Sequence, residues 1–74
     1  MELRYTRHAI ARMIQQGISE AMVEAVLLSP SWTPQRHSQN IRYDALVDGV
    51  RLAVVVAPRD ETIIVSVFWI DREV

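Results

Sequence analysis

The dipeptide Asp48-Gly49 constrains the fold of this chain more than any other feature of its sequence. It stands between two largely apolar runs, 41–47 and 50–57, and in this setting Asp-Gly predicts a β-hairpin closed by a two-residue type I′ turn. The turn fixes the register of the two strands, and the register decides which side chains share a face. One face should therefore carry a set of mainly apolar side chains: Ile41, Tyr43, Ala45, Val47, Val50, Leu52, Val54 and Val56.

A second turn, at residues 58–61, predicts a third antiparallel strand that pairs Val56 with Ile63. This register adds Ile63, Val65, Val67 and Trp69 to the apolar face. The opposite face would carry Arg42, Asp44, Leu46, Arg51, Ala53, Val55, Ile64, Ser66 and Phe68. Residues 32–38 should form an edge strand, because Pro34 cannot donate a hydrogen bond within a sheet. Two registers stay open for this strand, one with His37 opposite Arg42 and the other with Arg36 opposite Arg42.

The first half of the chain predicts two helices. Thr6 is a suitable N-cap for a helix that ends near Gln16, and Gly17 supplies the left-handed residue that closes it. Its buried stripe should be Ile10, Met13 and Ile14. Ser19 caps a second helix, which buries Met22, Val23, Val26 and Leu27 and ends at Pro30. The link between the helices is short, so we expect a two-helix hairpin packed on one face of a three- to four-stranded antiparallel sheet. The chain would then be a single α+β domain over residues 1–74.

Composition excludes several classes of protein. The net charge is −1, which differs from the strongly basic balance of a general nucleic-acid binder. Residues 1–42 carry a charge of +2 and residues 43–74 a charge of −3. No apolar run is long enough to cross a bilayer, and the first residues lack an apolar leader, so we expect a cytoplasmic protein without a membrane partner. With no cysteine, two histidines and two glycines, we expect no metal, no cofactor and no glycine-rich phosphate loop.

Two clusters of side chains suggest chemistry on phosphate. His8 and Arg12 are four residues apart, on the side of the first helix opposite its predicted apolar stripe. Arg36, His37 and Arg42 form a second cluster at the first hairpin. An imidazole can move protons and a guanidinium can hold a phosphate, which together would allow RNA cleavage without a metal. Both clusters can also be read as solvated surface.

Arg51 lies on the same sheet face as Arg42 and diagonally opposite Asp44. It could therefore bind RNA or form a structural ion pair with Asp44.

The string Tyr5-Thr6-Arg7-His8-Ala9-Ile10-Ala11-Arg12-Met13, followed by Gly17-Ile18-Ser19, resembles a family of small bacterial domains of unknown function. Those domains are similar to the RelE/ParE-like toxin superfamily. The resemblance continues through Pro30, Arg42-Tyr43 and the closing strand at residues 63–69, although Gln16 stands where arginine is frequent in the family. It implies a RelE-like fold, cleavage of free or ribosome-bound RNA, an antitoxin partner, and a role for His8, Arg12 and Arg42.

Two functional hypotheses follow. In the first, the chain is a toxin-like, metal-independent endoribonuclease with His8, His37 and Arg42 in catalysis and Arg12, Arg36 and Arg51 binding the nucleic acid. In the second, it is a binding module of the same fold without catalysis. Its partner, an antitoxin or a second copy of the chain, would then cover an apolar patch on the open sheet face: Leu46, Val55, Ile64 and Phe68.

Overall fold

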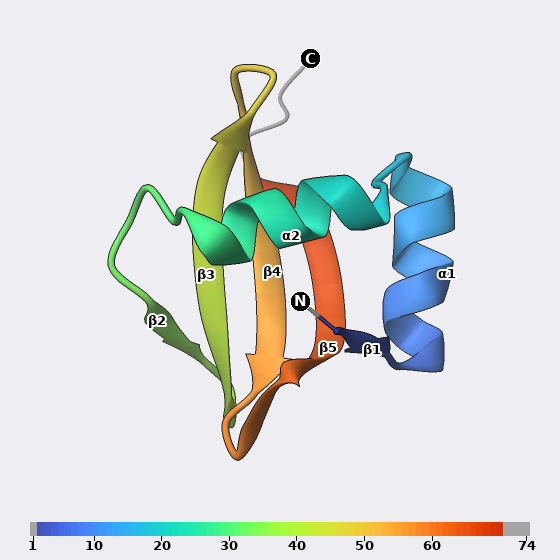
Figure 1. Ribbon diagram of the computed structural model, residues 1–74, viewed down its shortest axis with the longest axis vertical. Coiled ribbons are helices and arrows are strands. Elements are labelled where there is room, and N and C mark those ends of the chain that lie inside the picture. Colours follow the sequence, from blue (N-terminus) through green and yellow to red (C-terminus); the bar gives the residue numbers. More distant parts are fainter. Residues whose placement is uncertain (1, 71–74) are drawn as a thin grey trace.

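The computed structural model describes residues 2–70 and shows an α+β fold with two helices and a five-stranded mixed sheet (Figure 1). Along the chain the elements are β1 (Arg4–Tyr5), α1 (Arg7–Gln16), α2 (Glu20–Leu28), β2 (Gln35–His37), β3 (Asn40–Val47), β4 (Val50–Ala57) and β5 (Asp60–Ile70). The strand order in the sheet is β1-β5-β4-β3-β2. No helix within residues 2–70 is long and apolar enough to cross a membrane.

The central hairpin has the predicted register. Asp48 and Gly49 both have positive φ values, 53° and 78°, as a type I′ turn requires. Tyr43 pairs with Val54 and Ala45 pairs with Leu52. These side chains face α2 together with the apolar face of β5, and Leu52, Val54, Val56 and Val67 are fully buried there. The predicted core of the hairpin is confirmed.

The sheet has five strands where three to four were predicted, and it is not purely antiparallel. β1 pairs parallel to β5, with Arg4 opposite Ile63 and Tyr5 opposite Ile64. The amide of Thr6 also donates to the carbonyl of Ile64, at 3.1 Å. A strand of two residues is too short to show an alternating pattern, so the sequence indicates only an extended lead-in here.

A β-bulge in β5 changes the predicted faces. Val55 pairs with Ser66, whereas the next residue of β4, Val56, pairs with Ile64. Val65 is therefore the extra residue of a bulge, which shifts the side-chain alternation of β5. Ile64 becomes a fully buried core residue, and Ile63 and Val65 are only half-buried. The predicted pairing of Val56 with Ile63 and the predicted open-face position of Ile64 are both wrong.

Both helices are capped as the sequence predicts. The Thr6 hydroxyl accepts from the amide of Ala9 at 3.1 Å, and Gly17 closes α1 with a φ of 69°. The Ser19 hydroxyl accepts from the amide of Met22 at 3.2 Å and so caps α2.

The arrangement of the helices differs from the predicted hairpin. α2 runs across the strands and packs on β3 and β4, whereas α1 runs along the β5 side of the sheet (Figure 1). α1 therefore packs mainly against β5 and buries Ala9 and Met13. Ile10 and Ile14 are 48% and 77% exposed, so the predicted stripe is wrong for these two residues.

Candidate functional site

The sheet face opposite α2, which we call the open face, carries most of the residues that the sequence singled out. Arg42 of β3 pairs with Val55 of β4, which pairs with Ser66 of β5. The next row of cross-strand neighbours on this face consists of Asp44, Ala53 and Phe68. Ala53 and Val55 have no exposed surface although neither α1 nor α2 packs over them, so the surrounding side chains close over them. The open face thus has an apolar floor and a polar rim.

The pairing of β2 differs from both registers that the sequence left open. The turn between β2 and β3 is formed by Ser38 and Gln39, so His37 pairs with Asn40 and Gln35 pairs with Arg42. This register places Gln35 and His37 on the open face. Arg36 pairs with Ile41 and alternates to the other side of β2. The structure therefore separates Arg36 from His37 and Arg42.

The two histidines of the chain converge on β5 from opposite sides of the open face. His8, at the start of α1, places its Nε2 3.1 Å from the Ser66 hydroxyl. The His37 ring lies against the Phe68 ring, with 5.6 Å between centroids. Ser66 and Phe68 are alternate residues on the same face of one strand, so their Cα atoms are about 6.6 Å apart. His37 reaches Phe68 across β3 and β4, which shows that the sheet curls toward the open face.

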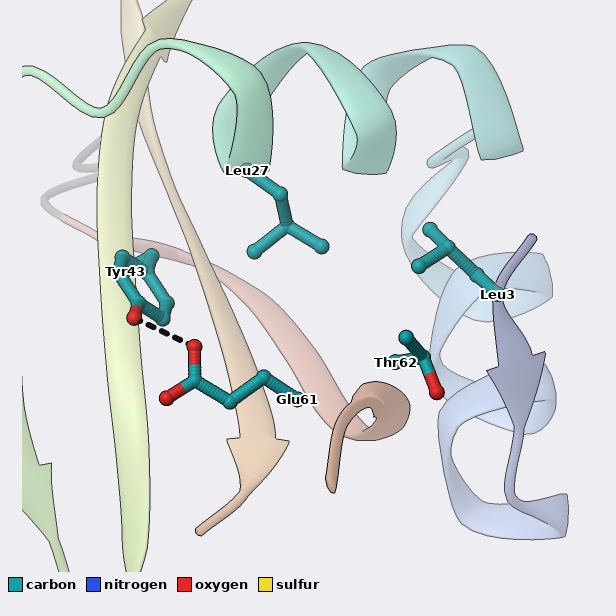
Figure 2. Close-up of a pocket in the computed structure, with 5 residues that line it drawn as sticks. All are labelled: Leu3, Leu27, Tyr43, Glu61 and Thr62. Carbon is teal, nitrogen blue, oxygen red and sulfur yellow. Dashed lines mark hydrogen bonds between the residues drawn. The ribbon is translucent and has the colours of Figure 1, made fainter. Parts of the chain in front are cut away.

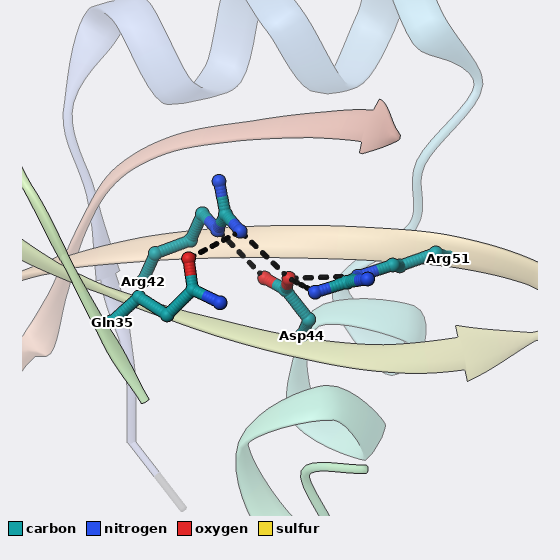
Figure 3. Close-up of polar contacts among 4 residues, drawn as sticks. All are labelled: Gln35, Arg42, Asp44 and Arg51. Carbon is teal, nitrogen blue, oxygen red and sulfur yellow. Dashed lines mark hydrogen bonds and ion pairs between the residues drawn. The ribbon is translucent and has the colours of Figure 1, made fainter. Parts of the chain in front are cut away.

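Asp44 organises the two arginines of the open face (Figure 3). Its side chain is only 3% exposed. Arg42 donates from Nε and Nη2 to its two carboxylate oxygens at 3.0 and 3.1 Å, and Arg51 donates from Nη2 to Oδ2 at 2.7 Å. Gln35 accepts a further bond from Arg42 at 2.8 Å. The predicted Arg51–Asp44 ion pair is confirmed, and the network as a whole keeps a charge of +1.

Each guanidinium keeps donors that this network does not use. A guanidinium has five N–H donors, and Nη1 of neither arginine takes part in a hydrogen bond within residues 2–70. Arg51 also stacks on the Trp32 ring, 3.9 Å from its centroid. The sequence did not predict this cation–π contact, because it placed Trp32 in an edge strand at residues 32–38, whereas β2 begins at Gln35. The arginines are thus held in place with part of their binding capacity free.

Arg12 lies one turn after His8 on the same side of α1 and is half-buried. It makes no hydrogen bond or ion pair within the described residues. Its helix position places it beside the open face, with His8 between it and the N-terminus of the helix.

The predicted apolar patch is reduced by the bulge and by the curl of the sheet. Ile64 belongs to the core, and Val55 is fully buried in the floor of the open face. Phe68 is half-buried against His37, and only Leu46 is widely exposed, at 58%. The four residues therefore do not form one exposed surface.

The other side of the sheet has a hollow of about 280 Å³ beneath the end of α2, lined by Leu3, Leu27, Tyr43, Glu61 and Thr62 (Figure 2). The Tyr43 hydroxyl donates to Glu61 Oε1 at 2.6 Å. This bond to the carboxylate, together with burial, raises the pKa of Tyr43 above its usual range. Among the described residues no group of three or more histidine, aspartate or glutamate side chains could hold a metal ion. Neither the hollow nor the Tyr43–Glu61 hydrogen bond adds a reactive group to the open face.

Comparison with known protein families matches residues 5–69 to the family described as "Domain of unknown function (DUF4258)". No curated protein and no solved structure matches the chain. The family match covers Tyr5 of β1, both helices, β2 to β4 and β5 as far as Trp69. It therefore includes every residue of the open face discussed above, and the chain belongs to this family of domains of unknown function.

Proposed function

We propose that this protein is a toxin-like, metal-independent endoribonuclease that binds RNA across the open face. The observation that carries the proposal is the convergence of His8 and His37 on neighbouring same-face positions of β5, beside two arginines held by Asp44. The resemblance of residues 5–19 to domains similar to RelE/ParE-like toxins supports the same reaction. Family membership alone does not, because the family's description gives no activity.

The reaction needs two proton transfers and one site of charge stabilisation. One imidazole removes the proton of the 2′-hydroxyl, whose oxygen then attacks the adjacent phosphorus. The other imidazole protonates the departing 5′-oxygen, so that a 2′,3′-cyclic phosphate and a 5′-hydroxyl end form. Histidine suits both roles because its ring can accept and donate protons near neutral pH. Either histidine can act as the base, and the other then acts as the acid.

Arg42 and Arg51 would hold the negative charge that develops on the phosphorane. Their free Nη1 donors can bind phosphate oxygens while Asp44 keeps the guanidinium planes fixed. Arg12 would bind a neighbouring phosphate at the α1 side of the face. Arg36 has no place in this arrangement, because it lies on the other side of β2.

The first test is growth of a bacterial host after tightly controlled expression, because this assay includes the ribosome and needs no chosen substrate. Wild type should arrest growth. His8→Asn and His37→Asn should each relieve the arrest, since removal of a catalytic acid or base costs about 10²- to 10⁴-fold in rate. Arg42→Ala should relieve it too, since removal of a donor that holds the developing charge costs about 10²- to 10³-fold. The control is Arg59→Ala, which removes an exposed arginine in the β4–β5 turn. Circular dichroism should confirm that all variants fold.

The purified protein gives the second test. With a chelator present, it should convert RNA to fragments with 2′,3′-cyclic phosphate ends, and it should leave a substrate with 2′-deoxyribose at the cleavage site intact. Cleavage or arrest that persists in the His8→Asn/His37→Asn double variant would refute the acid–base assignment. A soluble wild type that neither arrests growth nor cleaves RNA with ribosomes present would refute the function.

A further inference from the structure

The outer side of α1 is apolar although no element within residues 2–70 covers it. Ile10 and Ile14 lie one turn apart and are 48% and 77% exposed. They border a hollow of about 380 Å³ between α1 and the start of α2, whose other walls include Tyr5, Met13, Ile18 and Glu20. α1 stands at the margin of the molecule, beyond β5 and away from β2 and β3 (Figure 1). Another molecule could therefore approach this side without meeting the sheet.

The two ends of this surface carry opposite charges. Arg7 stands one turn before Ile10 and two turns before Ile14 on the same side of α1, and it is exposed. Glu20 lies at the other end, in the first turn of α2. Neither Arg7 nor Glu20 has an ion-pair partner within residues 2–70. The surface is thus apolar in its middle, positive at one end and negative at the other.

The edge of the hollow also contains a buried polar group that makes no hydrogen bond within the described residues. The Tyr5 hydroxyl is buried at its edge and has no hydrogen-bond partner within the described residues. Burial and the nearby carboxylates of Glu20 and Glu24 raise the pKa of Tyr5. A negative potential at this end would favour the approach of a cationic group.

A surface with this charge pattern is complementary to itself in the antiparallel orientation. If Ile10 of one helix faces Ile14 of an antiparallel copy, Arg7 of the first helix is level with Gly17 of the second. Gly17 is three residues before Glu20, so the two opposite charges would meet at both ends of the contact. Ala11, on the outward side of the helix, has a small side chain that permits close approach of two helices. A two-fold axis repeats each of these contacts, which is the usual geometry of a homodimer.

We infer that α1 pairs antiparallel with α1 of a second copy of this chain, with Ile10 packed against Ile14 and Arg7 paired with Glu20 across the two-fold axis. The contact is small, because a helix of ten residues is only about 15 Å long. The dimer should therefore be weak, with a dissociation constant of about 1–100 μM. His8 and Arg12 lie on the other side of α1, so the open face stays accessible in the dimer.

Sedimentation equilibrium over about 1 μM to 1 mM protein tests this inference. Wild type should dimerise. Ile14→Glu should weaken the dimer by about 100-fold or more, because the two-fold axis places two carboxylates in one apolar contact. Leu28→Glu is the matched control, since Leu28 is a 70% exposed leucine at the end of α2, away from this surface. It should leave the dissociation constant unchanged. Both substituted side chains are exposed, so both variants should fold.

A charge exchange gives a second, independent test. Arg7→Glu and Glu20→Arg should each weaken the dimer by about tenfold, and the double variant should return to within about threefold of wild type. Arg7→Glu puts an acid in the first turn of α1, where the helix dipole favours it, so loss of the dimer would not reflect loss of the helix. A wild type that stays monomeric at the highest concentration would overturn the inference. A dimer that survives Ile14→Glu, or a double variant that does not recover, would overturn it as well.

Discussion

Asp44 is the residue on which the geometry of the open face depends most. It is almost fully buried and binds two guanidinium groups, while Gln35 steadies one of them. A buried carboxylate without such partners would be strongly destabilising, and the same holds for partly buried guanidinium groups without the carboxylate. Asp44 therefore holds the two arginines in place and also neutralises half of their positive charge.

We predict that Asp44→Asn lowers the free energy of unfolding by about 3 kcal/mol, because two arginines with limited exposure lose their counter-charge. Urea denaturation followed by circular dichroism measures the change. The control is Asp48→Asn, since Asn-Gly forms a type I′ turn as readily as Asp-Gly. It should change stability by less than about 0.5 kcal/mol. Equal effects of the two substitutions would mean that the Arg42–Asp44–Arg51 network adds no stability.

At the level of single residues, the sequence predicted the candidate side chains and their sheet faces better than it predicted their contacts. His8, Arg42 and Arg51 were recognised as candidates, and Asp44 was recognised as a partner of Arg51. The contact of His8 with Ser66 and that of His37 with Phe68 were not predicted. Both contacts join segments far apart in the chain, and the contact of His37 with Phe68 also depends on the curl of the sheet, which no local pattern encodes.

Among the elements, the turns decided whether the register of a strand pair could be predicted. The Asp48-Gly49 turn permits one geometry, so its register was predicted residue by residue. The turn before β5 was expected at residues 58–61, whereas Ala57 pairs with Asp60 and the strand then contains a bulge. A bulge needs only one unpaired residue, and Ile63, Ile64 and Val65 are all apolar enough for either face. Periodicity could not locate it for that reason.

The turn between β2 and β3 carries backbone strain that can be tested. Ser38 has a φ of 60°, a conformation in which a side chain costs about 1 kcal/mol and glycine does not. We predict that Ser38→Gly raises the free energy of unfolding by about 0.5–1 kcal/mol. Thermal and urea denaturation would measure this gain.

Gln39→Gly is the matched control for Ser38→Gly. Gln39 has no positive φ, so glycine there only adds freedom to the unfolded chain and should be neutral or destabilising. A loss of stability in Ser38→Gly equal to that in Gln39→Gly would show that the Ser38 conformation costs nothing.

On the scale of the whole molecule, α1 separates two surfaces of different character. On one side, His8 and Arg12 border the open face with its histidines and arginines. On the other side, Ile10 and Ile14 border the apolar hollow next to α2. The sequence predicted that these isoleucines would be buried, because they share the i, i+3, i+4 spacing of an apolar stripe with Met13. α2 packs across β3 and β4, which leaves the outer side of α1 free.

The charge of the whole molecule sets how RNA binding should respond to salt. The net charge is −1, and within residues 2–70 only Arg12, Arg42 and Arg51 lie where RNA on the open face could be bound. Each phosphate contact to a single strand contributes a slope of about −0.7 to the plot of log K against log salt concentration. Three contacts predict a slope of about −2 for binding of a short single-stranded RNA.

This slope should be measured by fluorescence anisotropy with His8→Asn, so that the RNA stays intact. Arg51→Ala should make the slope shallower by about 0.7 and weaken binding to RNAs of any sequence. Arg36→Ala should change neither quantity, because Arg36 lies on the other side of β2. A slope that depends on Arg36 would place the bound RNA on the other side of β2. A slope much steeper than −2 would require phosphate contacts with arginines outside the open face. In either case, the open face would not be the main RNA-binding surface.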